Sequence, residues 1–436
     1  MSRSLASFFS LFLSTAILVL GDGLFGILLP LRANFDGFSD LTLGLMGTAY
    51  FAGFMLGSLL SPYSVRRVGH IRSFAVFASI ASALPILHVL APEPATWVLL
   101  RVLGGYCLAG LYMIIESWLN EQATNENRGG IFGLYRVVSL VGLTGGQLLL
   151  NVADPNGFTL FAIVAIFTSI ALVPVSLTRS VQPAPIENIK PDFKELWRIS
   201  PVGMLGCFVI GLTNGPFWTL GPVYAQQAGL DLQGISFFMT AAIVGGAIAQ
   251  VPFGRLSDRI DRRWVLIGTL AGAAIASLFL SFFSGTGHNE YVLYGGAFAF
   301  GAFALTLYAL CIAQANDNAQ PHQFVMVASG MMLVFSVGAM AGPIIVSLLM
   351  PFFGAGVLFG AGVLVYLPFI VFVFGRIMVR APVPQEERED FVAVPLARAA
   401  TPQMDLDPRS DITPDTDENI SENVDEDDDP ENKPSL

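Results

Sequence analysis

The sequence predicts an all-α membrane protein with twelve transmembrane helices in two six-helix pseudo-repeats. Its composition is the first reason: of 436 residues, 54% are hydrophobic and 13% are charged, whereas a soluble domain carries about 25% charged residues. The second reason is a series of twelve apolar stretches, each long enough for the roughly 20 residues that cross a bilayer. The third is a match between the two halves of the chain. Because the period-two alternation of β-barrel strands is absent, the spans are expected to be helices.

The charges are unevenly distributed along the chain. Residues 381–436 hold 17 acidic and 4 basic side chains, whereas residues 1–380 hold 16 acidic and 18 basic ones. The formal charge of −11 is therefore the sum of a nearly neutral, apolar body and an acidic tail. This distribution excludes a soluble enzyme, a disulfide scaffold and a basic nucleic-acid-binding protein.

The twelve predicted spans follow one another with short polar loops between them. Although Arg3 precedes the first apolar run, as in a signal peptide, no small-residue cleavage site follows, and the run is long enough to span. It is therefore interpreted as the first span. The first six spans cover residues 5–31, 41–63, 73–91, 95–119, 131–152 and 158–177. The second six cover residues 201–224, 232–253, 264–283, 291–313, 324–350 and 352–379.

Lysine and arginine in the short loops predict the orientation. With a cytoplasmic N-terminus, the outside loops carry Arg32 as their basic residue. Both termini are therefore expected in the cytoplasm of a bacterial cell, with the chain in the inner membrane. The inside loops carry twelve basic residues: Arg66, Arg67, Arg72, Arg128, Arg179, Lys190, Lys194, Arg198, Arg255, Arg259, Arg262 and Arg263.

The two halves repeat each other at two constant offsets. A shift of 192 residues aligns the first span with the seventh, and a shift of 196 fits the later spans, with the extra residues in the loop 284–290. Parallel repeats of this kind place a binding site at the midplane between the halves. The first shift pairs Asp22 with Asn214, Gly23 with Gly215, Pro30 with Pro222, Gly37 with Gly229, Gly53 with Gly245 and Arg67 with Arg259. The second pairs Gly105 with Gly301, Tyr112 with Tyr308, Asn120 with Asn316, Gly142 with Gly338 and Gly146 with Gly342.

These patterns divide the chain into four parts. Residues 1–178 form the first six-helix half and residues 201–380 the second. Residues 179–200, which are rich in proline and basic residues, are predicted to be a cytoplasmic linker. The acidic residues 381–436 cannot bury a core and are predicted to be disordered. A solvated tail without a specific function is the favoured interpretation, and regulation by contact with the arginine loops is the alternative.

The loop after the eighth span carries the first family resemblance. Residues 254–263 read GRLSDRIDRR, which resembles the G-x-L-x-D-R-x-G-R-R loop of the major facilitator superfamily, with Asp261 in place of the later glycine. The equivalent first-half loop keeps Arg67 and Gly69 but has Arg66 where the family has an acid. Residues 101–105, RVLGG, are similar to the family's R-x-x-x-G helix. Candidate gating residues are Gly69, Arg66, Arg67, Gly254, Asp258, Arg259, Arg262 and Arg263.

Finer features resemble the YcaD-like bacterial branch of this superfamily. They are Glu116-Ser117, Asn127-Arg128-Gly129, the GGQLL of residues 145–149 and Gly342-Pro343. The resemblance implies the major facilitator fold and a secondary transporter that moves a small solute by alternating access. The family's antiporter motif is partial in span five, where Gln147 stands in the place of proline. In the family's loop an acid such as Asp258 can pair with arginine across the halves and latch them.

Four charged residues fall within predicted spans: Asp22, Arg101, Glu116 and Arg136. A charge near the centre of a membrane helix costs about 2.5–3.5 kcal/mol and faces a partner or a wet cavity. Asp22 and Arg101 lie at similar predicted depth, so we expect them to pair. The two carboxylates are the candidates for carrying protons. The simpler alternatives are that Glu116, placed in the last turn of its span, pairs with a loop arginine and that Arg136 reaches the surface.

The polar residues of the spans predict a solute path. Arg101 and Tyr112 share one face of span four, with Gly105 between them leaving room near the backbone. In the second half Arg101 and Glu116 correspond to Ala297 and Ile312, so that half is expected to offer hydrogen bonds and packing while the first half carries protons. Trp218 could line an apolar pocket, although packing is the more usual role of such residues. The solute-cavity candidates are Tyr112, Gln147, Asn214, Trp218, Gln250, Tyr308 and Gln314.

Two functional classes remain open. The favoured one is a proton-coupled secondary transporter, inclined to efflux of apolar or amphipathic compounds, with uptake of a small polar metabolite as the alternative. The other is a membrane sensor or scaffold that does not transport. The sequence has no Walker loop, G-x-S-x-G or zinc-ligand spacing, so we expect no enzyme activity, cofactor or metal. The expected partners are a small solute, protons and the lipid bilayer, without nucleic acid, and the chain is expected to be a monomer.

Overall fold

The computed structural model describes residues 2–124, 127–177, 192–285, 287, 289–381, 383, 384, 388 and 391. All regular structure in these ranges is helical. The helices of the first half are α1 Ser2–Phe35, α2 Asp40–Val68, α3 His70–Leu90, α4 Pro94–Gln122, α5 Arg128–Leu148, α6 Thr159–Ile170 and α7 Leu172–Ser176, with the 3-10 turn η1 Leu149–Val152 after α5. The others are α8 Phe193–Ile199, α9 Pro201–Gln227, α10 Leu232–Arg259, α11 Arg262–Phe282, α12 Glu290–Ala304, α13 Leu307–Asn316, α14 Phe324–Phe353 and α15 Val357–Val379, with η2 Pro321–Gln323 before α14.

These helices confirm the predicted fold class. Eleven spans in the described residues are long and apolar enough to cross a membrane, and the pair α8–α9, bent by 112°, makes a twelfth. Each predicted span has a helical counterpart, although α6 with α7 and α12 with α13 divide two of them. Most of the predicted linker and tail lies outside the described residues, so the boundaries of the two halves stay predictions.

Several helices extend beyond the predicted apolar runs. The helix α4 continues to Gln122 and α10 to Arg259, because backbone hydrogen bonding carries a helix on through polar residues once it has begun. Glu116 is therefore not in the last turn of its helix, and Asp258 lies on a helix rather than in a loop. The predicted start of the last span at residue 352 is also wrong, since α14 includes it and Gly354, with a φ of 73°, ends that helix.

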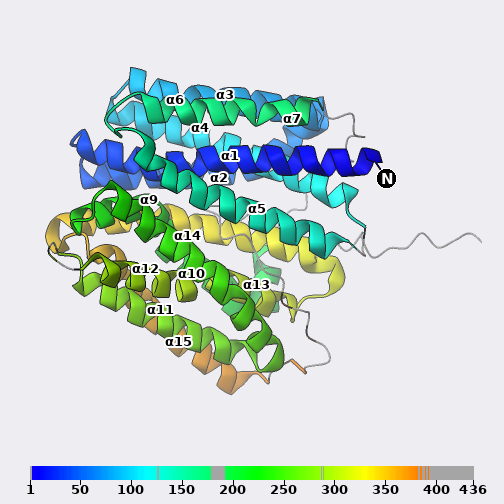
Figure 1. Cartoon of the computed structure of the whole chain (residues 1–436). Coiled ribbons are helices and arrows are strands. Elements are labelled where there is room, and N and C mark those ends of the chain that lie inside the picture. Colours follow the sequence, from blue (N-terminus) through cyan, green and yellow to red (C-terminus); the bar gives the residue numbers. More distant parts are fainter. Residues whose placement is uncertain are drawn as a thin grey trace, which may run out of the picture.

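The helices form two groups that meet along their long sides. Helices α1–α7 pack with one another, as do α9–α15, and α2 with α14, α1 with α9 and α5 with α10 join the groups (Figure 1). Hydrogen bonds link the groups toward the end opposite the N-terminus. The Asn34 Nδ2 donates to Gln226 Oε1 over 3.0 Å, and the Thr48 hydroxyl donates to the Met340 carbonyl over 2.6 Å.

Equivalent glycines make equivalent helix contacts in the two halves. A Cβ added at Gly53 would collide with the carbonyl oxygen of Val102, and one at Gly245 would collide with that of Phe298. The two collisions correspond under the sequence repeat. The same holds for Gly105 against Tyr50 and Gly301 against Ala242, for Gly23 against Leu143 and Gly215 against Ala339, and for Gly146 against Leu20 and Gly342 against Leu212. The repeat in the sequence is thus a repeat in helix packing, where small residues let backbones approach closely.

One expectation about these glycines is wrong. Gly105 was expected to leave room for solute beside the stripe of Arg101 and Tyr112, but the backbone of α2 at Tyr50 fills that space. The polar path must therefore run between side chains rather than over the backbone of α4.

We predict that Gly53→Ala and Gly245→Ala each destabilise the protein by about 1–3 kcal/mol, because the added methyl group overpacks a helix pair. Thermal unfolding in detergent measures the effect. Gly268→Ala and Gly295→Ala are the matched controls, since a Cβ at either position meets open space. Equal melting temperatures for all four variants would contradict the packing account.

Candidate functional site

The first buried polar contact joins α1 to α4. The Tyr112 hydroxyl donates to Asp22 Oδ2 over 3.1 Å, and the residue Asp22 is only 7% exposed. Asp22 lies in an apolar stretch of α1. A buried carboxylate there needs a hydrogen-bond donor from the protein, and the phenol of Tyr112 supplies it. Two of the predicted site residues are thereby brought together.

Arg101 lies at the same helix pair, nearer the end opposite the N-terminus. Its guanidinium carbon is 4.3 Å from the centroid of the Tyr50 ring, a cation–π contact. Arg101 also lines a small cavity between the two helix groups, together with Met46 and Trp218. A predicted proton-path residue and a predicted solute residue thus share one cavity, whereas a direct pair between Arg101 and Asp22 stays a prediction.

A second buried carboxylate lies toward the N-terminal end of the same bundle. The Tyr135 hydroxyl donates to Glu116 Oε1 over 3.0 Å, and Glu116 is 5% exposed. Beside it, His70 Nε2 and the Ser117 hydroxyl are 3.3 Å apart. Arg136, half-buried, lies within electrostatic range of the Tyr135 hydroxyl. The pairing of Glu116 with a loop arginine stays a prediction.

The tyrosines bring these two contacts into one cluster. The Tyr112 hydroxyl lies within electrostatic range of both Tyr50 and Tyr135. A series of polar side chains therefore runs through the first half from Arg101, by way of the three phenols, to Glu116. We call Asp22, Tyr50, Tyr112, Tyr135 and Glu116 the tyrosine–carboxylate cluster.

In the second half the corresponding positions are occupied by neutral side chains. Asn214, the repeat partner of Asp22, donates through Nδ2 to the Ala304 carbonyl over 3.3 Å. Its Oδ1 is buried with no hydrogen-bond partner among the described residues. Tyr308, the partner of Tyr112, packs edge-on against Phe335. Gln250 is buried on α10.

The remaining solute candidates lie apart from one another. Gln147 is buried where α5 meets α10: its carbonyl accepts from the Ser236 hydroxyl, and its amide nitrogen has no partner among the described residues. Gln314, in contrast, lies near the end of α13 and lines a different pocket. Trp218 stacks edge-on against Phe217 as well as lining the cavity beside Arg101.

The second-half gating loop is held by ion pairs. Arg262, almost fully buried, contacts Asp258 over 2.9 Å and Asp317 over 2.7 Å. Arg263 and Asp261 form a second pair over 2.7 Å. Burial acts to raise the pKa of the Asp261 carboxyl, but the hydrogen bonds and charge of Arg263, with the charge of Arg388, hold that pKa below its usual value.

The polar partners of Asp258 among the described residues belong to its own half and the tail. Besides Arg262, its carboxylate accepts from the Phe391 backbone N–H over 3.1 Å, and the Phe391 ring packs on Gly254. The latch across the halves therefore stays a prediction for another conformation. Arg259 is exposed at the end of α10, while in the first-half loop Arg66 and Arg67 are exposed and Gly69, with a φ of 85°, links α2 to α3.

Sequence reasoning missed three residues of these sites. Tyr50 and Tyr135 are single polar groups in apolar spans, and Asp317 lies just past a helix end. The match between the two halves of the sequence did not single out any of these three residues. Their roles depend on which helices face one another, as α2 faces α4 and α11 lies against α13.

The chain matches known transporters over most of its length. The sequence profile described as Major Facilitator Superfamily matches residues 11–246 and 203–404. The uncharacterized MFS-type transporter YcaD of Escherichia coli is 26% identical over 345 residues, which cover 79% of this chain and 88% of that protein.

Solved structures with the same fold support this match. A POT family peptide transporter in an auto-inhibited form superposes with a TM-score of 0.69 at 12% identity, over 89% of this chain and 99% of that one. A bacterial homologue of the human lysosomal transporter Spinster gives 0.67 at 14% identity, over 89% and 99%. The nucleoside transporter NupG gives 0.66 at 11% identity, over 87% and 99%. The chain therefore belongs to the major facilitator superfamily and is a multi-pass membrane transporter of the secondary type, not an enzyme.

Proposed function

We propose that this transporter couples solute movement to protons through its first half. The observation that carries the proposal is the asymmetry of the two repeats. In the first half, Asp22 and Glu116 are buried and each accepts a hydrogen bond from a tyrosine. Asn214 and Ile312 occupy the equivalent positions of the second half and cannot exchange a proton with solvent.

A buried carboxylate with one phenolic donor suits reversible protonation. The ionised form keeps a charge-assisted hydrogen bond, and the protonated form removes a charge from a low-dielectric site. Protonation then changes the electrostatic energy of the helix pair that holds the carboxylate. Because the Tyr112 hydroxyl donates to Asp22 and lies within electrostatic range of Tyr135, the two sites can influence each other.

The solute path runs between the halves, beside Arg101 and Trp218. The cavity there combines apolar walls from Leu29, Met46 and Trp218 with one guanidinium group. Apolar walls with a flexible methionine favour apolar or amphipathic compounds, and we propose their export as the physiological direction. Uptake of a small polar metabolite is the second candidate, which the guanidinium of Arg101 favours.

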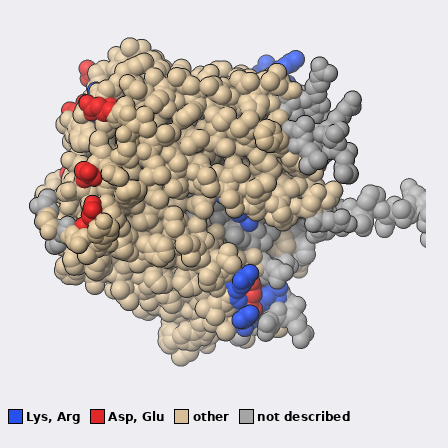
Figure 2. Space-filling view, in the orientation of Figure 1, with Lys and Arg blue, Asp and Glu red and all other residues tan. Residues whose placement is uncertain are grey.

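The distribution of surface charge supports an orientation. Acidic side chains gather at the end of the molecule opposite the N-terminus and basic side chains mainly at the other end (Figure 2). Since basic residues concentrate on the cytoplasmic side of membrane proteins, we propose that both termini are cytoplasmic and that the protein lies in the inner membrane as a monomer. The hydrogen bonds between the halves then close the outer side.

The direct experiment is a solute panel with purified protein in vesicles. A pH-sensitive dye inside the vesicles reports proton flux under an imposed proton gradient. Solute-dependent proton movement supports coupling, and its direction relative to the solute separates export from uptake. Solute movement without proton movement would refute the coupling. If no solute moves and no counterflow occurs, the protein is better explained as a sensor or scaffold.

We predict that Tyr112→Phe and Tyr135→Phe each slow proton-driven transport about tenfold or more. Each removes a hydrogen bond to a charged group, which contributes about 1.5–3 kcal/mol. Tyr106→Phe is the matched control, because Tyr106 lies on the same helix as Tyr112 but packs its ring against Phe77. If all three variants transport alike, the tyrosines have no part in coupling.

A further inference from the structure

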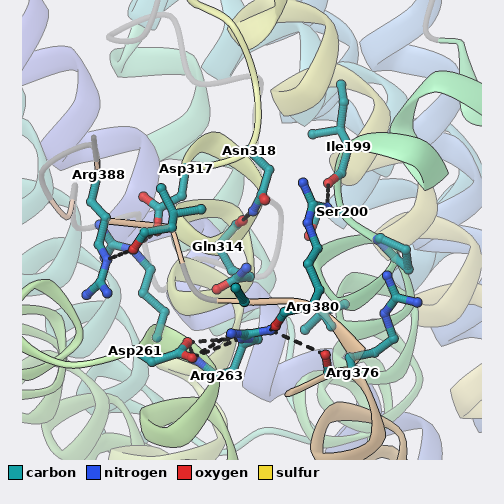
Figure 3. A pocket seen from close by; sticks show the side chains of 15 residues that line it. Ile199, Ser200, Asp261, Arg263, Gln314, Asp317, Asn318, Arg376, Arg380 and Arg388 are labelled. Atoms are coloured by element: carbon teal, nitrogen blue, oxygen red, sulfur yellow. Dashed lines mark hydrogen bonds and ion pairs between the residues drawn. The ribbon is translucent and has the colours of Figure 1, made fainter. Parts of the chain in front are cut away.

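A pocket lined by five arginines lies at the end of the second helix group that carries the tail. Arg262 and Arg263 come from α11, Arg376 from α15, and Arg380 and Arg388 from the chain after it. We call these five residues the arginine pocket. All five line one pocket beside the start of α9, the α10–α11 turn and the end of α15, and Figure 3 labels Arg263, Arg376, Arg380 and Arg388 around it.

Two of the five arginines are already neutralised. Arg262 pairs with Asp258 and Asp317, and Arg263 pairs with Asp261. Both guanidinium groups are almost completely buried, and these ion pairs hold them in place at the inner side of the pocket. Asp261 also interacts electrostatically with Arg388.

The remaining three arginines have no ion pair with the residues that the structure describes. Arg380 donates to the Ile199 carbonyl, and Arg388 donates to the carbonyls of Val383 and Ile260. Carbonyl oxygens orient these guanidinium groups without neutralising them. Arg376 makes no hydrogen bond or ion pair with a described residue through its side chain, although its backbone carbonyl accepts from Arg263. Among the described residues, the pocket thus joins five guanidinium groups to three carboxylates, those of Asp258, Asp261 and Asp317.

The pocket opens where the apolar surface of the bundle ends. On α15, Met378 and Val379 are 75% and 77% exposed, next to Arg376 and Arg380. Aromatic side chains mark the same level: Trp264 is half exposed and packs against Phe374. Tryptophan is enriched at the boundary between hydrocarbon and headgroups. Taking Trp264 to mark this boundary, we place the arginines at the depth of phospholipid phosphates.

We propose that the arginine pocket binds the phosphate of an anionic phospholipid headgroup. Guanidinium groups bind phosphate oxygens through paired, charge-assisted hydrogen bonds, and three arginines without an ion pair to a described residue line this pocket. Basic pockets between membrane helices are known to accept such headgroups. The adjacent exposed side chains of α15 offer a surface for the acyl chains. A soluble phosphate shares the same chemistry and is the other source to be tested.

A bound headgroup would connect α15 and the start of the tail to the gating loop. Arg388 already contacts Ile260 in that loop, and Arg262 links it to Asp317. The occupied pocket would therefore hold the α10–α11 turn against the end of α15.

Lipid retention by the full-length protein tests the proposal. The protein is reconstituted in phosphatidylcholine bilayers containing one-fifth phosphatidylglycerol, extracted in mild detergent, and its retained lipid is identified by native mass spectrometry. A parallel arm measures binding of radiolabelled inorganic phosphate in detergent. The variant is Arg376→Gln with Arg380→Gln. The control, Arg72→Gln with Arg255→Gln, removes the same charge from exposed positions at the same end.

We expect the pocket variant to retain roughly 20–30-fold less phosphatidylglycerol, since each arginine near an anionic surface contributes about fivefold. The control should match the wild type. Arg376→Lys with Arg380→Lys should restore part of the retention, because lysine keeps the charge, and melting temperatures establish that all variants fold. Equal phosphatidylglycerol retention by the pocket variant and the control would overturn the proposal. If the pocket variant loses binding of inorganic phosphate but the wild type retains no phosphatidylglycerol, the ligand is a soluble anion and the proposal of a phospholipid headgroup is overturned.

Discussion

The structure depends on one constraint, which is that hydrocarbon offers no partner to a buried polar group. A charge near the centre of a membrane helix costs about 2.5–3.5 kcal/mol, so each must be satisfied within the protein. Asp22 and Glu116 meet this condition through phenolic hydroxyls, and Arg101 through the face of an aromatic ring. Asp22, Glu116 and the three tyrosines of the first half are consequently held close together in one cluster.

The same constraint explains why the two repeats can share a backbone and differ in chemistry. Matched glycines bring α2 onto α4 and α10 onto α12 with the same carbonyl contacts, so both halves have the same helix packing. This packing depends on glycine having no side chain at the contact. The residues at neighbouring positions can therefore differ in chemistry between the two halves. The position of Asp22 in one half can therefore be Asn214 in the other without a change of fold.

The spans and the repeat could be predicted from the sequence because they depend on local composition and on fixed spacing. Asp22 and Glu116 could also be singled out, since a carboxylate in an apolar run is conspicuous. Their partners could not, because Tyr112 reaches Asp22 from 90 residues away and Tyr135 reaches Glu116 from the next helix. The predicted place of Glu116 in the last turn of its helix is wrong for a related reason, since the apolar run ends before the helix does. Nothing in the sequence near Phe391 or Asp258 indicated that the two residues, 133 positions apart, are in contact.

The central claim is that the tyrosine–carboxylate cluster couples protons to solute without being needed for solute passage. It is tested most directly by comparing two modes of transport in the double variant Asp22→Asn, Glu116→Gln. Solute counterflow, which needs no net proton movement, should continue at close to the wild-type rate, while accumulation driven by a proton gradient should be lost. If the double variant still accumulates solute against its gradient when protons alone supply the energy, the cluster is not the coupling site.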